Sequence, residues 1–536
     1  MQNFIIEQET FRFTSKELFM RNAKKLSALI LSAIMLATGC ANNITPGGST
    51  EVKDNSSALA DDTGTGDSNT DSGNSEPDAK SVKDVVKDIK VDTKVKFLAW
   101  YNLNDQDIAK TYKELFGVPE NIPAGYEKSK TVKSSSGSES TVDDKPFVDV
   151  CTISYAERYS ILAKLIQSDD SPDAFPCEMN FAYNCIDYGS QLMYEPVDDI
   201  IDFSLAEFAQ YAQAQQQTTI GKSNYVPVYD TEPLNFLWYR ASVIKENGFE
   251  DPWELYEKNE WTWSKFLEMS QKFTDKENSK YAVDGYNVDM PLWTTSGMAL
   301  VGLSDGKFKG NFREEKIISA MDYLRLFAPT QKGYRYPREI ENSWSPSYSD
   351  WADGNTLFFS DGSWRYDDIW QKYKKRNKWS DDEINFVPFP RCDDEQTYYQ
   401  GVNINSFVFP KGSKNPEGYK SLIYACAFVE NDAEQTSTVR KKAISENDWN
   451  DKLLDRLDKV NSPETFVPVV ELKSMFVYQD GLFCGECYIN LITDWCYMKG
   501  EDYKKNLEDK TKGGYVTELE KALDEFNQAI ELNLAN

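Results

Sequence analysis

The chain has no histidine among its 536 residues, and basic residues are in the minority. Without histidine, neither the Ser-His-Asp and Cys-His nucleophilic systems nor the common histidine-bearing zinc sites can be built. Lys and Arg number 59 against 87 Asp and Glu, a net charge of −28. Because binding to the phosphates of nucleic acids needs a basic surface, we expect no nucleic-acid partner. Chemistry based on two carboxylates, such as glycoside hydrolysis, stays open.

The apolar run nearest the start, Leu26–Leu36, is too short to span a membrane, which takes about 20 residues. The basic run Arg21–Lys25 precedes it, and Ala37-Thr-Gly-Cys40 follows it. This order resembles a bacterial lipoprotein signal, although Ala37 stands where Leu is usual. The resemblance implies a signal peptide over 1–39 and lipidation of Cys40. The true start is predicted at Met20, because the acidic segment before it is unlike an export signal.

The segment after Cys40 is poor in apolar residues. Ala41–Lys80 consists mainly of Asn, Ser, Thr, Gly and Asp, so it buries too little apolar surface to offset the entropy of ordering. We therefore predict a lipidated Cys and a disordered tether over 40–90. A coil of about 50 residues has a typical span of roughly 40 Å, which would hold a folded body away from its membrane anchor.

The other cysteines do not complete a recognisable metal site. Cys484-Gly-Glu-Cys487 has the spacing of half a zinc site, but the sequence has no second Cys-x-x-Cys pair. We expect no metal and no cofactor. Disulfides are compatible with export, and their connectivity cannot be read from the spacing.

Alternating strand and helix patterns begin near Val91 and predict an α/β fold. A buried strand over Val95–Trp100 is followed by a helical pattern over Asp105–Phe116. A second strand is predicted over Phe147–Ile153, and Ser154 with Glu157 forms a capping-box pattern before the next helix. Short turns between such units indicate a parallel, doubly wound sheet with its ligand site at the carboxyl ends of the strands. The length of this part favours two lobes.

Several segments further along resemble the extracellular solute-binding proteins of bacterial ABC importers, in particular the carbohydrate-binding family that includes maltose-binding protein. They occur in the order of the family, and they are Ala163–Phe175, Lys222–Val228 with Leu237–Arg240, Glu246–Pro252, Trp261–Phe266, Trp351–Trp364, Val387–Pro390 and Gly401–Ser406. Leu357-Phe358 replaces the usual Ala-Met, and the last hundred residues match loosely.

The resemblance implies a periplasmic-binding-protein-like fold of two doubly wound α/β lobes, joined by crossover strands, with a hinged ligand cleft. The first lobe is predicted to comprise 91–228 and 385–431. The second is predicted to comprise 229–384 and 432–536.

Sugars present apolar C–H faces ringed by hydroxyls, so a carbohydrate cleft combines aromatic rings with hydrogen-bonding side chains. Position along the chain selects the candidates, which lie at strand ends, at the crossings and in the segments that match the family. The predicted ligand-binding residues are Trp100, Tyr101, Glu178, Asn180, Tyr229 (with Glu232 beside it), Trp293, Asp361, Trp364, Arg365, Asn403 and Asn405. Trp364 is the leading candidate for stacking on a ring. Asn403 and Asn405 are expected on one face of a strand. Core packing or helix capping stays the alternative for each, and Trp263 is expected in the core.

These features predict a monomeric, non-catalytic receptor, lipid-anchored on the extracellular face of the membrane, that delivers a carbohydrate to an ABC permease. Two other hypotheses stay open. One is an anchored glycosidase that uses Glu178 and Asp361 as its carboxylate pair. The other is a glycan-capturing surface lipoprotein without a permease.

Overall fold

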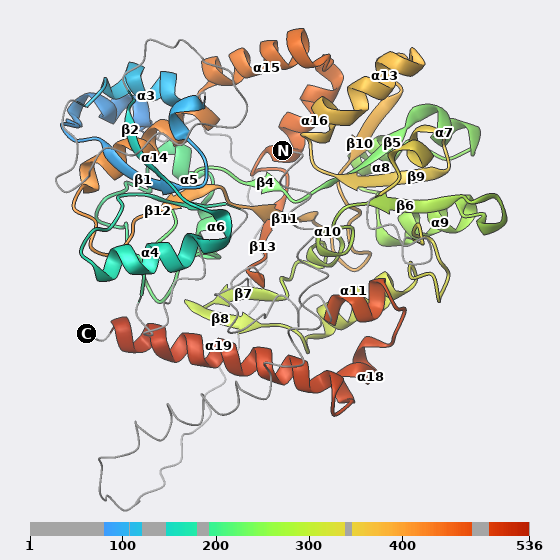
Figure 1. Ribbon diagram of the computed structural model, residues 1–536. Coiled ribbons are helices and arrows are strands. Elements are labelled where there is room, and N and C mark those ends of the chain that lie inside the picture. Colours follow the sequence, from blue (N-terminus) through green and yellow to red (C-terminus); the bar gives the residue numbers. More distant parts are fainter. Residues whose placement is uncertain are drawn as a thin grey trace, which may run out of the picture. The chain divides into compact units, whose positions relative to one another are not determined.

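The computed structural model describes residues 80–106, 108–119, 146–178, 192–337, 346–473 and 492–534 (Figure 1). The predicted signal, residues 40–79 of the predicted tether with Cys40, Asn180 and the Cys484–Cys487 pair lie outside these ranges. Residues 80–90 of the predicted tether lie inside them, and they include a helix at Val82–Val85 whose Val82 is fully buried, so the prediction of a disordered tether is wrong for this part. Within them, no helix combines the length and the apolar character that crossing a membrane requires.

The first body is built on parallel strands that begin near the amino end of the described chain. Strand β1 pairs with β2 from Val95↔Val148 to Ala99↔Thr152, and a parallel bridge from Phe97 to Ala174 adds the segment before β3. Strand β12 then pairs antiparallel with β3. The strands are β1 (Val95–Ala99), β2 (Val148–Thr152), β3 (Phe175–Cys177) and β12 (Ser406–Val408). The two predicted strands and the parallel pairing are thus confirmed.

Helices cover this body and supply buried apolar residues to its core. Tyr112 of α3 is fully buried and its hydroxyl lies 2.8 Å from the Ser421 hydroxyl of α14. The helices are α2 (Val82–Val85), α3 (Ile108–Phe116), α4 (Arg158–Gln167), α5 (Ala206–Ala209), α6 (Ala212–Gln216) and α14 (Pro416–Asn431). The capping-box prediction was wrong: Tyr155–Glu157 forms a 3₁₀ turn, α4 begins only at Arg158, and the Ser154 side chain makes no capping bond.

The second body holds a mixed sheet of order β10-β5-β9-β6. Strands β6 and β9 are parallel, whereas β5 runs antiparallel to β9 and to β10. The strands are β5 (Phe236–Arg240), β6 (Tyr281–Gly285), β9 (Thr356–Asp361) and β10 (Ile384–Val387). The flanking helices are α7 (Ala241–Glu246), α8 (Pro252–Glu257), α9 (Trp263–Phe273), α10 (Asp289–Thr294), α11 (Glu315–Arg325), α12 (Tyr348–Ala352) and α13 (Gln371–Asn377).

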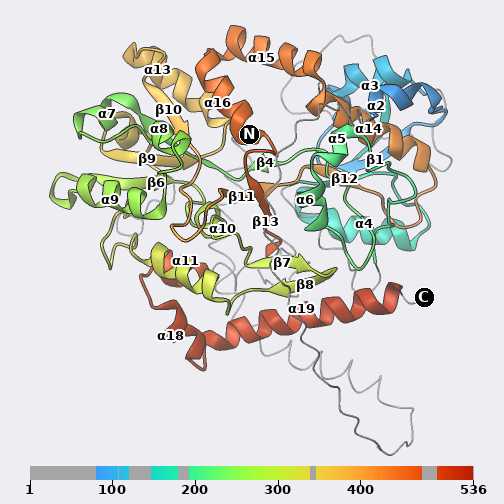
Figure 2. The ribbon, with the colours of Figure 1, turned by 180° about the vertical axis from the view of Figure 1, so that it is seen from behind.

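A three-stranded sheet lies between the two bodies in both ribbon views (Figures 1 and 2). It contains β4 (Glu232–Pro233), β11 (Tyr399–Asn403) and β13 (Val467–Val470), with β11 in the middle. We call it the crossing sheet. The return to the first body was expected near Asn385, but β10 pairs with β5 in the second body. The chain therefore returns later, between β11 and β12, and the boundary at 385 was wrong.

The last described part of the chain adds helices and contacts a hairpin. The hairpin is β7 (Val301–Ser304) with β8 (Lys307–Gly310), and the helices are α15 (Ala433–Asn447), α16 (Asp451–Asn461), α18 (Tyr503–Glu508) and α19 (Lys512–Leu534). Helix α19 lies along β8, as both ribbon views show. Its buried residues Val516, Leu519, Leu523 and Ile530 follow helical spacing and form one apolar stripe.

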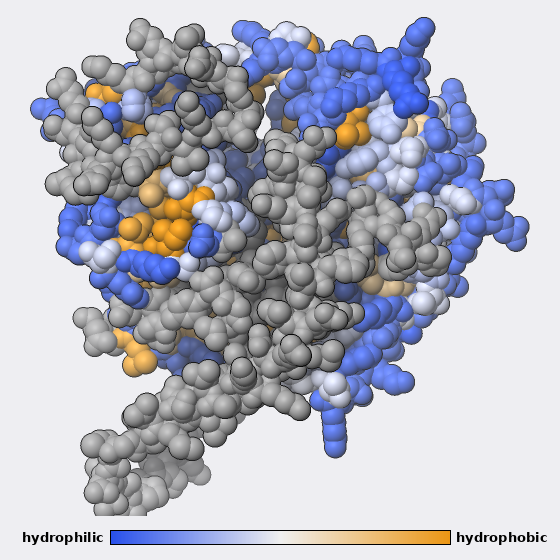
Figure 3. All heavy atoms as spheres, in the orientation of Figure 1, coloured by the Kyte–Doolittle hydropathy of each residue, from blue (hydrophilic) through white to orange (hydrophobic). Residues whose placement is uncertain are grey.

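The core of the second body is rich in aromatic side chains. Trp238, Trp351 and Trp370 are fully buried, and the rings of Trp351 and Trp370 have centroids 4.2 Å apart. Each ring of this size removes a large apolar area from water and so dominates the packing energy. On the face drawn in Figure 3, hydrophilic side chains dominate the outer rim, consistent with the net charge of −28.

Candidate functional site

Aromatic and charged side chains follow all three strands at one edge of the first body. Trp100 and Tyr101 come directly after β1, Tyr155 lies just beyond β2, and Glu178 follows β3. Because these strands run in parallel, their carboxyl ends meet at one edge, where open α/β sheets bind ligands. The structure therefore brings Trp100, Tyr101 and Glu178 together, as the strand pattern predicted.

The rings at this edge surround a guanidinium group. Trp100 packs edge-on against Tyr155, with centroids 5.0 Å apart, and against Tyr101 at 5.7 Å. The guanidinium carbon of Arg158 lies 3.9 Å from the Tyr155 ring centroid and 5.9 Å from that of Trp100. A cation over aromatic faces stabilises both partners and fixes the rings in place.

Glu178 is connected to this cluster of rings through Tyr101. Their side chains are hydrogen-bonded, with the tyrosine hydroxyl as the donor. Burial raises the pKa of the Glu178 carboxyl, and the bond to Tyr101 and the charge of Arg158 partly offset that rise. Burial and then the charge of Glu178 raise the pKa of Tyr101. These groups can donate and accept hydrogen bonds beside flat rings, which is the chemistry that recognises a sugar.

In the second body, the segment after β9 carries a second group of charged and aromatic side chains. Asp361 is almost fully buried, and its carboxylate accepts bonds from Arg365 Nε at 2.6 Å and from the Gly362 N–H at 2.9 Å. The indole of Trp238 donates to the Asp361 carbonyl at 3.2 Å. Burial raises the pKa of Asp361, and Arg365 opposes the rise. Asp361 thus holds the loop in shape.

Trp364, on this loop, presents its ring to solvent. Its side chain is 43% exposed, and it is the one aromatic among the large hydrophobic residues that are exposed in the described part. A Cβ added at Gly362 would lie 1.9 Å from the Trp364 ring, so the ring lies directly against the Gly362 backbone. An exposed indole is suited to stacking on the C–H face of a sugar.

Two tyrosines that are not among the predicted ligand-binding residues flank Arg365. The guanidinium carbon lies 5.8 Å from the ring centroid of Tyr286 and 5.2 Å from that of Tyr348. Tyr286 directly follows β6, where Gly285 adopts φ +115° and an added Cβ would meet the Ser360 carbonyl oxygen at 2.2 Å. The strand-end rule that selected Trp100 would also have selected Tyr155 and Tyr286. Arg158 gave no such signal, because it stands inside a helical pattern.

At the crossing sheet, Glu232 of β4 pairs with β11, from which the chain returns to the first body. It is the register partner of Asn403, and Asn405 Nδ2 donates to its carboxylate at 3.3 Å. Because β11 ends at Asn403, the strand alternation expected to place Asn403 and Asn405 on one face does not extend to Asn405. Tyr229 is buried, and burial together with the Cys426 thiol raises its pKa.

Carboxyl groups accumulate beside this crossing. Burial raises the pKa of Asp230 to about 6 and that of Glu232 to about 7, and the charge of Asp230 adds to the rise at Glu232. The pKa of Glu430, at the end of α14, is raised to about 7 by burial and by repulsion from both. Glu430 is the most exposed of these groups, so water screens its charge most. Within the described ranges, no group of three or more Cys, Asp or Glu side chains is placed to hold a metal ion.

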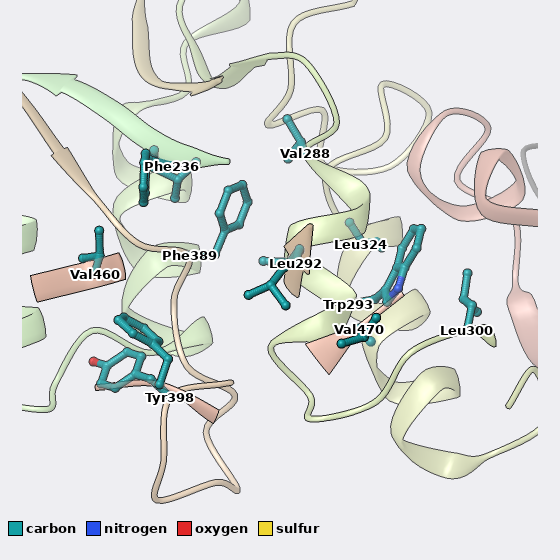
Figure 4. Packing of buried hydrophobic residues seen from close by; sticks show 14 of the residues in the cluster. Phe236, Val288, Leu292, Trp293, Leu300, Leu324, Phe389, Tyr398, Val460 and Val470 are labelled. Atoms are coloured by element: carbon teal, nitrogen blue, oxygen red, sulfur yellow. The ribbon is translucent and has the colours of Figure 1, made fainter. Parts of the chain in front are cut away.

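Trp293 lies in the core in this structure. Its side chain is fully buried among apolar neighbours (Figure 4). Its indole donates to Glu471 Oε2 at 3.0 Å. Glu471 also accepts bonds from the N–H groups of Leu300 and Val301, at 2.7 and 3.1 Å. No face of the ring is open to a solute in this arrangement. Trp263 packs on Tyr323 with centroids 4.7 Å apart, which confirms its predicted structural role.

The sequence of residues 148–431, a little more than half of the chain, matches the family profile described as bacterial extracellular solute-binding protein. The fold defines the class of protein, a two-lobed α/β protein of the periplasmic-binding-protein-like type. The chain belongs to the family of bacterial extracellular solute-binding proteins. No curated protein matches it.

Solved structures with the same fold are distant in sequence. An uncharacterized protein from Listeria monocytogenes is 14% identical with a TM-score of 0.52, over 81% of this chain and 100% of that one. A sugar transporter from Rhizobium etli, in an open conformation, is 12% identical with a TM-score of 0.50, over 82% and 99%. An extracellular solute-binding protein from Staphylococcus aureus in complex with maltose is 12% identical with a TM-score of 0.48, over 83% and 98%. The first two likenesses show the periplasmic-binding-protein-like fold.

Proposed function

We propose that this protein is a receptor that binds a carbohydrate between its two bodies and delivers it to an ABC permease. The observation that carries the proposal is the exposed Trp364 ring next to Gly362, on the loop where Asp361 bonds Arg365. The first body supplies a complementary set of rings and hydrogen-bonding groups around Arg158 and Glu178. Aromatic faces combined with such groups favour an oligosaccharide over a peptide or an amine.

We further propose that Cys40 carries a lipid anchor on the extracellular face of the membrane and that the protein acts as a monomer. Support comes from the lipoprotein-like order of the basic run, the apolar run and Cys40, and from the family, whose members are extracellular. A tethered receptor stays near its permease and can still turn toward it.

Isothermal titration calorimetry of the full-length protein against a panel of linear and cyclic glucans, other oligosaccharides, peptides and polyamines tests the solute class. We expect binding in the micromolar range or tighter to at least one oligosaccharide. Binding to a peptide or polyamine, with no response to any glycan, would refute the carbohydrate assignment. A change in permease ATPase activity on adding the loaded receptor tests delivery.

The glycosidase alternative is disfavoured by the state of Asp361. Its carboxylate is almost fully buried and bonded to Arg365 and to a backbone N–H, so it is poorly placed to act as a nucleophile or base. Incubation of the wild type and of Glu178→Gln with glycans that bind decides the matter. Release of reducing sugar that is lost in Glu178→Gln would show catalysis, and intact glycan in both would leave binding as the activity.

A further inference from the structure

A set of contacts other than the strand pairing of the crossing sheet joins the first body to elements of the later chain, and one of these contacts is made to the β13 edge of that sheet. On the first body, these contacts come from the turn after α6 and from Leu192. On the other side, they come from the edge of β13, the tip of the β7–β8 hairpin and the end of α19. None of these elements carries a residue of the candidate solute site.

Gln217 makes a two-point contact with strand β13. Its amide nitrogen donates to the Pro468 carbonyl at 2.7 Å, and its amide oxygen accepts from the Val470 N–H at 3.0 Å. The side chain amide thus takes the place of a neighbouring strand at the edge of the crossing sheet. A paired edge is protected from water and from other chains.

Two glycines bring backbone against backbone at the hairpin tip. The Gly221 N–H donates to the Gly306 carbonyl at 2.8 Å, and a Cβ added at Gly306 would lie 2.1 Å from the Gly221 carbonyl oxygen. Both residues have positive φ, at +62° and +75°. A side chain at position 306 would prevent this contact, so the glycine allows the two turns to lie this close together.

The end of α19 supplies the third contact. Asn533 Oδ1 accepts from the Leu192 N–H at 3.1 Å. The helix is itself fixed to the hairpin, because Asn527 exchanges two bonds of 2.9 Å with the Phe308 backbone and Glu531 pairs with Lys307 at 2.6 Å. Contact at Gly306 and contact at Asn533 are therefore mechanically linked through β8.

We propose that Gln217, the Gly221–Gly306 pair and the Leu192–Asn533 pair form one cooperative latch that holds the first body against the later chain and opens as a unit when the two bodies change their arrangement. The latch acts on the free protein and does not depend on which solute binds. Its effect on affinity rests on the proposed function, since the energy of opening enters binding only where binding moves the bodies.

Hydrogen exchange of the full-length protein without solute tests the latch, because each contact includes a backbone N–H that can be followed. The reporters are the amides of Val470, Gly221 and Leu192. In Gln217→Ala we expect about tenfold faster exchange at all three, since two hydrogen bonds are lost and the sites open together. Gln216→Ala is the matched control, as this neighbouring side chain is exposed.

A second variant keeps the test independent of β13. Gly306→Ala should accelerate exchange at Leu192 and Val470, whereas Gly302→Ala, where a Cβ meets its nearest neighbour at 3.7 Å, should not. Amides of β9 report on global stability and should keep their rates. Acceleration confined to Val470 in Gln217→Ala, or to the hairpin in Gly306→Ala, would overturn the cooperative latch, and so would unchanged rates or equal acceleration of β9.

Discussion

Replacement of Glu232 by Gln is predicted to change the pH dependence of stability. Glu232 is half-buried at the crossing sheet, beside Asp230 and bonded by Asn405. Burial and the charge of Asp230 raise the pKa of its carboxyl from 4.5 to about 7. Gln keeps the size of the side chain and can still accept from Asn405, so the substitution removes the ionisable group with little change in packing.

The sign follows from proton binding. Between pH 4.5 and about 7 the folded chain keeps a proton on Glu232 that the unfolded chain has lost. The raised pKa therefore contributes stability that is present below pH 4.5 and is lost as the pH rises through about 7. Above that range the wild type carries a poorly solvated charge, and the Gln variant does not.

The magnitude follows from the size of the rise. A pKa change from 4.5 to about 7 corresponds to an upper limit of about 3 kcal/mol, at about 1.4 kcal/mol per pH unit. Residual exposure of Glu232 lets water screen the charge, so we expect Glu232→Gln to be more stable than the wild type by about 1–2 kcal/mol at pH 8. At pH 4.5 or below the two proteins should differ little.

Urea unfolding followed by tryptophan fluorescence at several pH values from 4 to 8 measures this difference. Glu260→Gln, at an exposed position, is the matched control and should follow the wild type throughout. A Glu232→Gln protein that is less stable than the wild type at pH 8, or that differs from it equally at every pH, would refute the reasoning.

Three further predictions concern the solute site, a buried carboxylate and the anchor. Trp364→Ala should weaken binding of the recognised glycan about tenfold by calorimetry, because a stacked ring contributes about 1 kcal/mol or more, and an unchanged affinity would remove Trp364 from the site. Glu471→Gln should lower the free energy of unfolding by about 1–3 kcal/mol in urea, since an NH₂ group would then face a buried N–H or the Trp293 indole, and an unchanged midpoint would contradict this. Cys40→Ser should move the protein from the membrane to the soluble fraction with its glycan binding intact, and retention on the membrane would rule out the lipid anchor.

Local sequence patterns predicted the first body well because its elements are close along the chain. The apolar run of β1 and the helical spacing of α3 each depend on neighbouring residues, and both were found. The capping box failed because Tyr155–Glu157 closes a 3₁₀ turn in place of the first turn of α4. A capping pattern shows which groups can form a capping hydrogen bond. It does not decide at which of two neighbouring residues the helix begins.

The return crossing was misplaced because burial does not reveal a strand's partner. Both Phe386-Val387 of β10 and Phe407-Val408 of β12 read as buried strands, but one pairs with β5 and the other with β3. Pairing between segments so distant in sequence is decided by tertiary packing. Tertiary packing also explains Trp293, whose aromatic character suited a cleft but whose indole satisfies the buried Glu471.

The strand-end rule predicted which candidate residues lie together better than residue type did. It found Trp100, Tyr101 and Glu178 as one cluster, and applied to β6 it would have found Tyr286. It could not find Arg158, whose place among three rings depends on how α4 packs against the sheet. Whether these residues bind solute stays a prediction.

Each half of the candidate site is held by contacts within its own body. Arg158 fixes the rings after β1 and β2, while the Asp361–Arg365 pair fixes the loop that carries Trp364. The solute therefore does not have to order either half. The free-energy cost of binding that remains is the cost of moving the two preformed halves to the distance at which both contact the solute. Under the proposals above, the spacing of the two bodies depends on the crossing sheet and on contacts such as that of Gln217 with β13. Substitutions there should change affinity for every bound solute by the same factor, whereas substitutions of Trp364 should change the preference among solutes.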